Sequence, residues 1–190
     1  MQNLSVRLGT IASLVPFGAK VCDVGTDHAF LSIALKKSGR AASVIATDIN
    51  KKPLKKAEEN VEKSGVDGIS LRLCDGIEGV ERQEADTFIV AGIGGEVISG
   101  ILSRGIEKLK FSNVTLVLQP TTSPEILRKF LYDNGFSIKD EIAVEENGKL
   151  YSVMKCCYSG EKQVKENYLY FSGKLSPKDP IGKKYIEKYL

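Results

Sequence analysis

The architecture of this 190-residue chain follows from Val21-Cys22-Asp23-Val24-Gly25-Thr26-Asp27-His28-Ala29-Phe30-Leu31. The apolar beginning predicts a buried strand, Gly25 predicts a tight turn, and the residues from His28 onward predict a helix. Such a strand, turn and helix form the first βα unit of a doubly wound α/β sheet, where nucleotide-type ligands bind. We therefore expect the residues from Asp23 to His28, Thr26 among them, to contact a ligand.

The charge of this turn restricts the choice of ligand. Dinucleotide-binding turns carry glycines that let the backbone approach a pyrophosphate, but here only Gly25 remains, with Asp27 and Ala29 at the alternate positions. Carboxylates at positions 23 and 27 would repel a pyrophosphate and attract a ligand that carries an ammonium and a sulfonium group. The turn therefore favours S-adenosylmethionine. An NAD-dependent oxidoreductase on the same fold is the alternative.

Hydrophobic periodicity extends this unit into an alternating pattern along the chain. Apolar residues at positions 4, 8, 11 and 15 predict a first helix. The expected strands are 20–23, 43–48, 69–74, 87–90 and 114–118, and the expected helices between them are 28–37, 50–65, one around 97–102 and 123–133. Two final strands, 136–145 and 149–158, flank Asn147-Gly148, a strong hairpin signal. The pattern predicts an α/β fold with a mostly parallel, doubly wound sheet and an antiparallel C-terminal hairpin.

Polar residues follow the second and third expected strands, at the edge where ligands bind in such sheets. Asp48 is placed to accept hydrogen bonds from both ribose hydroxyls, with Ile49 beside it as a second cofactor contact. An acid at the start of the next helix is the alternative reading of Asp48. Asp75 is a candidate for the adenine amino group, and Gly76 would allow close approach to the ring. A simple Asp-Gly turn is the alternative there.

The fourth and fifth strands end in residues that suit a flat acceptor base. Gly92-Ile93-Gly94-Gly95 is expected to form a backbone-lined floor beside the methyl donor, with Gly92 also touching the cofactor. A glycine-rich strand-to-helix turn is the plainer reading. Gln119 is a candidate for a hydrogen bond to a base edge, in a loop stiffened by Pro120, and a strand-end glutamine in water is the alternative.

Composition indicates a globular protein without a membrane segment. The chain is 42% hydrophobic and 27% charged, and no apolar run reaches the length of about 20 residues that a membrane helix needs. The first seven residues lack the apolar core of a signal peptide. The four cysteines have no metal-ligand spacing, and the single histidine, His28, has no metal-binding companions, so we expect a cytoplasmic protein with reduced cysteines and no metal. The sequence does not indicate an oligomeric state.

The excess positive charge lies in the last thirty residues. Residues 161–190 hold seven lysines and four acidic residues, whereas the first 160 residues are balanced. Several tyrosines accompany these lysines, which suits RNA contact or a partner surface, and an ordinary solvated tail is the alternative. We expect one domain over residues 1–159 and a basic tail over residues 160–190.

Four segments of the sequence resemble one family, the bacterial tRNA (adenine-22-N1)-methyltransferases. They are the ligand turn 23–31, Ala91-Gly92-Ile93-Gly94-Gly95, Leu118-Gln119-Pro120 and Glu146-Asn147-Gly148-Lys149-Leu150-Tyr151, and Ser5-Val6-Arg7-Leu8 is similar to the family's N-terminal signature. The resemblance implies a class I Rossmann-like methyltransferase that uses S-adenosylmethionine on N1 of adenine 22 in tRNA. It also implies a C-terminal helical domain, which we expect to be truncated or absent here. Thr121 departs from the asparagine usual at its position.

The implied reaction suggests roles for individual residues. Neutral adenine has a lone pair on N1, so the transfer needs alignment and stabilisation of the positive charge that reaches the purine. Asp27 is the candidate catalytic carboxylate, and a cap for a helix starting at His28 is the alternative. Arg7 and the cluster Lys51, Lys52, Lys55 and Lys56 are candidate phosphate contacts. A non-catalytic RNA-binding domain is a further alternative for the whole chain.

Overall fold

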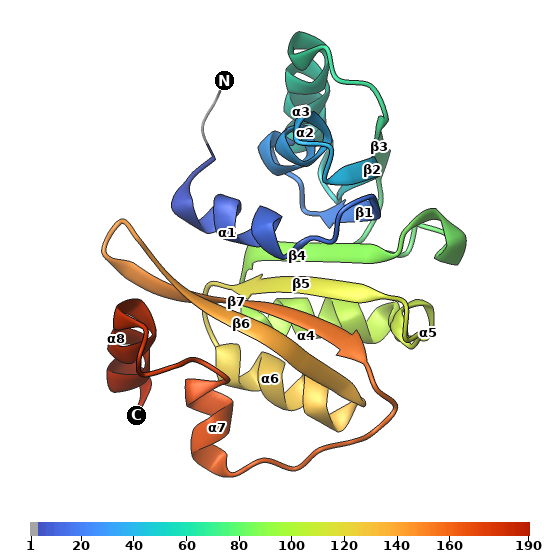
Figure 1. The fold of residues 1–190 in the computed structure, drawn as a ribbon. Coiled ribbons are helices and arrows are strands. Elements are labelled where there is room, and N and C mark those ends of the chain that lie inside the picture. The colour runs from blue at the N-terminus through green and yellow to red at the C-terminus, as the bar shows by residue number, and fades with distance from the viewer. Residues whose placement is uncertain (1–3) are drawn as a thin grey trace.

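A seven-stranded sheet forms the centre of the computed structural model, which describes residues 4–190. Residues 1–3, where the predicted first domain and the signal-peptide assessment begin, lie outside the described residues. The sheet order is β3-β2-β1-β4-β5-β7-β6 (Figure 1). The strands are β1 (Ala19–Val24), β2 (Ala41–Asp48), β3 (Ile69–Leu73), β4 (Thr87–Ile93), β5 (Thr115–Pro120), β6 (Phe136–Glu146) and β7 (Lys149–Tyr158).

The pairing of the strands confirms the predicted fold class. Strands β1 to β5 are all parallel, whereas β7 runs antiparallel to both β5 and β6. In the turn of the final hairpin, Asn147 and Gly148 have φ angles of 51° and 70°. Positive φ at both central residues is what a two-residue type I′ hairpin turn requires, and Asn-Gly meets it at low conformational cost. β4 and β5 continue to Ile93 and Pro120, beyond the predicted ends at 90 and 118.

Helices cover both faces of the sheet. They are α1 (Val6–Leu14), α2 (Phe30–Lys37), α3 (Lys51–Ser64), α4 (Gly95–Arg104), α5 (Ile106–Leu109), α6 (Pro124–Asp133), α7 (Asn167–Ser172) and α8 (Pro180–Tyr189), with a 3-10 turn η1 (Arg82–Glu84). On one face, Ile11 of α1 and Leu35 of α2 pack against Val21 and Val44. On the other face, α4 packs against β4 and β5, and α6 packs against α4 and β6, in a second cluster. Strands buried on both sides explain the nearly continuous apolar runs.

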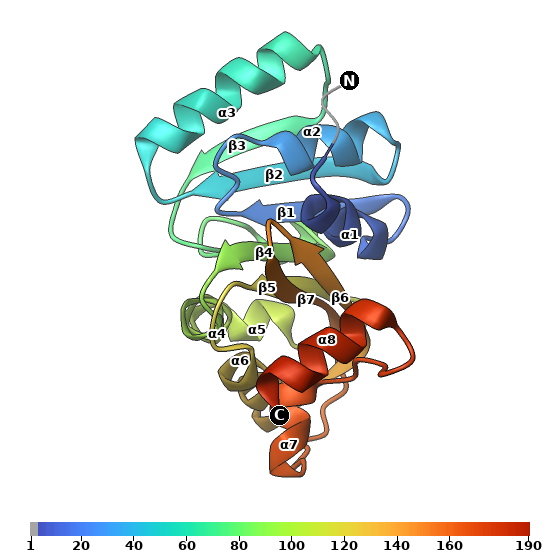
Figure 2. The same ribbon diagram turned by 90° about the vertical axis from the view of Figure 1, so that its left-hand side faces the viewer.

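The two helices of the last thirty residues pack against the rest of the chain. α7 lies against α6, and α8 lies across the hairpin of β6 and β7 (Figure 2). The link is Arg128 of α6, which is fully buried and pairs with Glu141 at 2.6 Å. The same guanidinium donates to the carbonyls of Tyr170 and Phe171 and to the hydroxyl of Tyr185. These contacts join the segment to the core, and the proposed boundary at residue 160 remains a prediction.

Candidate functional site

A cleft of about 340 Å³ opens at the carboxyl ends of β1 and β4. Its wall is formed by residues from α1, from the loop after β1, from the start of α2 and from the end of β4. They are Arg7, Leu8, Asp23, Val24, Gly25, Thr26, Asp27, His28, Phe30, Leu31, Ala91, Gly92 and Ile93. This is the edge of the sheet where parallel α/β folds bind their ligands. The structure thus brings the predicted ligand turn and the predicted glycine segment together around one cavity.

The backbone of the loop after β1 is held in a strained shape. Gly25, Asp27 and Ala29 have φ angles of 71°, 49° and 58°, in the left-handed region. Two backbone N–H groups, of Gly25 and Thr26, donate to the carbonyl of Thr47 on β2, at 2.8 and 3.0 Å. Strain of this kind at non-glycine residues persists where the surroundings enforce it, and it concentrates at functional sites.

The strained loop also corrects the predicted start of the helix. We expected a helix from His28, but α2 begins at Phe30, because the left-handed Ala29 interrupts helical geometry. Ala29 is the N-cap residue and provides no side-chain hydrogen bond. The alternative reading of Asp27 as a helix cap is therefore wrong. A β-carbon on Gly25 would meet nothing within 4 Å, so open space lies above this position.

Asp23 and Asp27 lie in different environments. Asp23 is 5% exposed, and its Oδ2 accepts hydrogen bonds from the hydroxyls of Thr26 at 2.9 Å and Ser32 at 2.6 Å. Burial raises the pKa of Asp23 above its ordinary value, and the two hydroxyls oppose that rise. Asp27 is exposed over 68% of its side chain and lies 3.5 Å from Nε2 of His28. Asp27 therefore presents the accessible carboxylate of the loop.

His28 connects the loop to its neighbours. Its ring stacks on Phe30 with 5.4 Å between centroids, and its carbonyl accepts a hydrogen bond from the side chain of Asn60. Among residues 4–190 no group of three or more histidine, cysteine or acidic side chains is arranged to hold a metal ion. The four cysteines, Cys22, Cys74, Cys156 and Cys157, are unpaired with one another.

The end of β2 lies beside the cleft. Asp48 is 8% exposed, and its Oδ1 accepts a hydrogen bond of 2.8 Å from the backbone N–H of Asn50. Asn50 is the N-cap of α3, so Asp48 supports the turn into that helix. Within residues 4–190 its Oδ2 has no hydrogen-bond donor in the structure, and it is the atom available to ligand hydroxyls. Ile49 is 63% exposed, an apolar surface beside a carboxylate that suits one face of a purine.

Asp75 and Gly76 follow β3 as predicted. Asp75 accepts a hydrogen bond of 2.9 Å from Arg104 of α4, and both side chains are partly exposed. Gly76 is buried with φ at 58°, and a β-carbon there would lie only 2.8 Å from Ile101. Close packing against α4 therefore explains the glycine. Contacts of these two residues with an adenine ring remain predictions.

The glycine segment after β4 divides into two parts. Gly92 is exposed at a bulge in β4, where a β-carbon would lie 3.7 Å from the guanidinium of Arg7. Gly94 caps α4. Gly95 is buried, and close packing explains the glycine, since a β-carbon there would overlap the carbonyl of Ser123. Only Gly92 and Ile93 of this segment reach the cleft wall. A contact of Gly94 or Gly95 with substrate stays a prediction.

Arg7 is held in place by two acceptors that are distant in sequence. Its Nη1 donates to Gln119 at 2.6 Å, and its Nε donates to Glu146 at 3.2 Å. Gln119 is fully buried and donates in turn to the carbonyl of Pro120. The alternative reading of Gln119 as a side chain in water is therefore wrong. The Ser5 side chain and Arg7 hold the pKa of Glu146 below its usual value.

The sequence patterns did not indicate all residues of the cleft. Leu8, whose spacing predicts the first helix, packs against the core and also lines the cavity, together with Phe30 and Ala91. Each of them is next to a predicted site residue in the sequence or lies in the ligand turn, and this proximity could have indicated a place in the cleft. The predicted lysine cluster at positions 51, 52, 55 and 56 is exposed along the first turns of α3.

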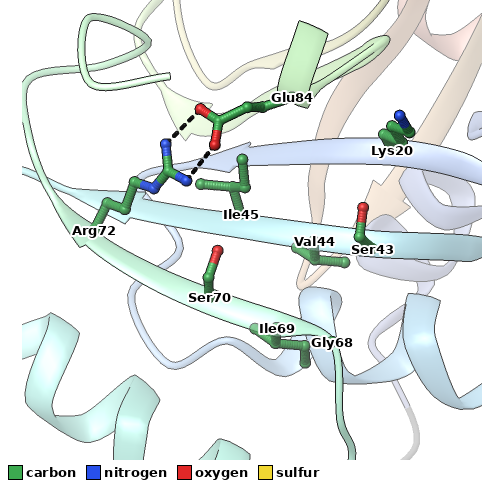
Figure 3. Close-up of a pocket in the computed structure, with 9 residues that line it drawn as sticks. All are labelled: Lys20, Ser43, Val44, Ile45, Gly68, Ile69, Ser70, Arg72 and Glu84. Carbon is green, nitrogen blue, oxygen red and sulfur yellow. Dashed lines mark hydrogen bonds and ion pairs between the residues drawn. The ribbon is translucent and has the colours of Figure 1, made fainter. Parts of the chain in front are cut away.

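A second hollow of about 400 Å³ lies on β1 to β3, over the half of the strands away from the cleft (Figure 3). Ser43 and Ser70 project into it, and Arg72 and Glu84 face each other through two hydrogen bonds of 2.7 and 2.6 Å. It exists because the connection between β3 and β4 contains only η1 and no covering helix. This hollow contains no predicted ligand residue, so the cleft is the candidate site.

The fold and the cleft together define a methyltransferase domain. Residues 4–154 match the family model described as a methyltransferase domain. More particularly, the chain belongs to the TrmK-like tRNA (m1A22) methyltransferase family, which confirms the resemblance. No helix within residues 4–190 is long and apolar enough to cross a membrane.

Three comparisons, two of them with the B. subtilis m1A22 tRNA methyltransferase, support this membership. The tRNA (adenine(22)-N(1))-methyltransferase of Bacillus subtilis is 40% identical over 153 residues, which are 80% of this chain and 64% of that protein. The crystal structure of B. subtilis TrmK has 33% identity and a TM-score of 0.89, covering 99% of this chain and 83% of that one. The Streptococcus pneumoniae Sp1610 complex with S-adenosyl-L-methionine has 34% identity and a TM-score of 0.89, covering 98% and 87%. The chain thus matches just under two thirds of the B. subtilis sequence.

Proposed function

We propose that this protein transfers the methyl group of S-adenosylmethionine to N1 of adenine 22 in tRNA. The observation that carries the proposal is the cleft beside Gly25 and Asp27, in a chain 40% identical to a B. subtilis enzyme named for this reaction. A tRNA-modifying enzyme with four unpaired cysteines suits the cytoplasm. The proposed catalytic domain spans residues 1–159, with residues 160–190 as the basic tail, which packs against it through α7 and α8.

The residues of the cleft fit S-adenosylmethionine. The missing β-carbon at Gly25 leaves open space for a ligand. The charge of Arg7 is offset by Glu146, so Asp27 supplies the uncompensated exposed charge, which favours the cationic end of the donor. Asp48 would hold the ribose and Ile49 one face of the adenine. When bound, the cofactor supplies a methyl group made electrophilic by the sulfonium.

The protein's task in the reaction is alignment and charge stabilisation. The N1 lone pair of adenine forms the new N–C bond, and the electrons of the broken C–S bond pass to sulfur, so no prior deprotonation is needed. The purine gains positive charge as the bond forms. Asp27 lies at the cleft wall with an exposed carboxylate, where it would stabilise that charge and accept a proton from the 6-amino group.

The acceptor must reach this cleft as an unpaired base. N1 lies on the pairing edge of adenine, so the target nucleotide has to leave its helix before reaction. Gly92 and Ile93 form the wall on the β4 side of the cleft. This wall has no charged side chain of its own, which suits a flat, neutral ring.

The direct test uses purified protein, labelled S-adenosylmethionine and an unmodified tRNA transcript. We expect incorporation of one methyl group, located at adenine 22 by mass mapping, and no incorporation when that adenine is replaced by guanine. Asp27→Asn should lower kcat by about 100-fold while S-adenosylhomocysteine still binds. Turnover near wild type in this variant would remove Asp27 from the chemistry, and absence of methylation by the wild type would favour a non-catalytic RNA-binding domain.

A further inference from the structure

Four lysines form one face on the first turns of α3. Lys51, Lys52, Lys55 and Lys56 are all exposed, and none has an acidic partner within 4 Å in the part of the chain that the structure describes. At 100° per residue these four positions span a continuous arc opposite the buried residue Ala57. We call this arc the lysine face of α3.

The charge order along α3 works against the stability of the helix. The positive end of a helix dipole is the N-terminus, which favours acidic residues, yet the first turn of α3 contains none. The acidic residues Glu58, Glu59 and Glu62 follow in the second half, nearer the negative end. The first turn of α3 is therefore placed against the dipole, whereas its last turn carries both Glu62 and Lys63. The dipole does not favour the lysines of the first turn, and a partner of negative charge would give them a function.

The lysine face lies at the same edge of the sheet as the cleft. α3 begins three residues after Asp48, at the carboxyl end of β2, and the ligand turn follows β1, which pairs with β2 in parallel. Figure 2 shows the start of α3 on the side of the sheet where β1 and β2 end. A polyanion that brings one nucleotide to the cleft would pass this face.

We propose that the lysine face of α3 binds the phosphate backbone of the substrate RNA beside the target nucleotide. This proposal rests on the proposed function and adds the surface that grips the RNA. Lysine ammonium groups act as mobile point charges, which suits phosphates of varied spacing and carries no base specificity. The face thus sets affinity and orientation, and the cleft selects the base.

The test compares two double variants of the full chain with the same change in charge. Lys51→Glu with Lys52→Glu reverses two of the four charges of the lysine face, so that its net charge falls from +4 to zero. Lys37→Glu with Lys63→Glu is the control, because both residues are exposed in the last turns of α2 and α3, at the opposite edge of the sheet. Binding of unmodified tRNA transcript is measured by fluorescence anisotropy at several salt concentrations, and thermal unfolding is measured in parallel.

We expect opposite effects on binding and stability. The lysine-face variant should bind tRNA about tenfold or more weakly, with a salt slope reduced by about 0.7–0.9 per lost phosphate contact. Its Tm should rise by about 1–4 °C, because acids now occupy the N-terminus of α3. The control pair should keep the tRNA affinity and lose thermal stability.

Kinetics separate this proposal from the proposed function. In the lysine-face variant, KM for tRNA should rise while kcat and the affinity for S-adenosylhomocysteine stay at the wild-type level. An unchanged tRNA affinity and salt slope in a wild type that methylates tRNA would overturn the lysine face alone. A wild type that binds tRNA through this face without methylating it would overturn the proposed function alone.

Discussion

Arg7 donates a hydrogen bond of 2.6 Å to Gln119 across 112 positions of sequence. The bond joins α1 to the carboxyl end of β5, and the second contact of Arg7, with Glu146, joins α1 to the final hairpin. The guanidinium also lies close to Gly92 at the cleft wall. Arg7 therefore holds three elements around the cleft, and a contact of its guanidinium with phosphate stays a prediction.

Replacing Arg7 should destabilise the protein through Gln119. Arg7→Met leaves the buried amide oxygen of Gln119 without a donor, which costs about 1–3 kcal/mol of unfolding free energy. Chemical denaturation measures this loss. Adding Gln119→Met should restore part of the stability, because both polar partners are then absent. A double variant as unstable as the sum of the two single variants would contradict the pairing.

Asp23→Asn should keep or raise stability at neutral pH and weaken cofactor binding. Burial raises the pKa of Asp23. The protonated carboxyl therefore contributes its full stabilisation below pH 3.8, the ordinary pKa, and this contribution is lost as the pH rises through the raised pKa. An amide oxygen still accepts from Thr26 and Ser32. We expect the Tm advantage of the variant at pH 7 to shrink toward pH 4. S-adenosylhomocysteine should bind about tenfold more weakly. A variant less stable than wild type at pH 7 argues against this account.

The buried pair of Arg128 and Glu141 should hold residues 160–190 in place. Arg128→Met leaves Glu141 buried without its partner, and such a loss costs about 3–5 kcal/mol. The double variant with Glu141→Leu should recover much of this. Limited proteolysis should cut near residues 161–166 faster in the single variant. Unchanged unfolding and proteolysis of Arg128→Met would show that the pair does not anchor the segment.

The pair of Arg72 and Glu84 should make the stability of the protein depend on pH in the acid range. The hydrogen bonds from Arg72 and from the backbone of Glu81 lower the pKa of Glu84 to about 2. The stabilisation that ionised Glu84 contributes is present above pH 4.5, its ordinary pKa, and is lost as the pH falls from there toward 2. The denaturation midpoint of wild type should exceed that of Glu84→Gln at pH 7, with the gap closing below pH 4. A gap independent of pH would exclude this pair as its source.

Local patterns were sufficient for most of the fold. The Asn147-Gly148 turn, the alternation of strands and helices, and the polar residues at the strand ends each follow from chemistry within a few residues. The start of α2 at Phe30 could not be predicted in this way. Alanine disfavours the left-handed region, and only the packed surroundings hold Ala29 there.

The contacts that sequence reasoning missed are long-range. Nothing near Gln119 indicates that Arg7 will bury its amide, and nothing near Glu141 indicates Arg128. A bulge between Ile138 and Asp140 shifts the strand register just before Glu141, which lies on the buried side of β6. Such pairs are set by tertiary packing, so a single sequence carries no local signal for them.

We expect the loop after β1 to select the ligand by charge, and calorimetric titration measures that selection. Wild-type protein is titrated with S-adenosylmethionine and, separately, with NADH, and Asp27→Asn serves as the variant with one charge removed. We predict saturable binding of one S-adenosylmethionine per chain, weaker binding in the variant, and no heat of binding with NADH. Firm binding of NADH by a protein that ignores S-adenosylmethionine would contradict the account.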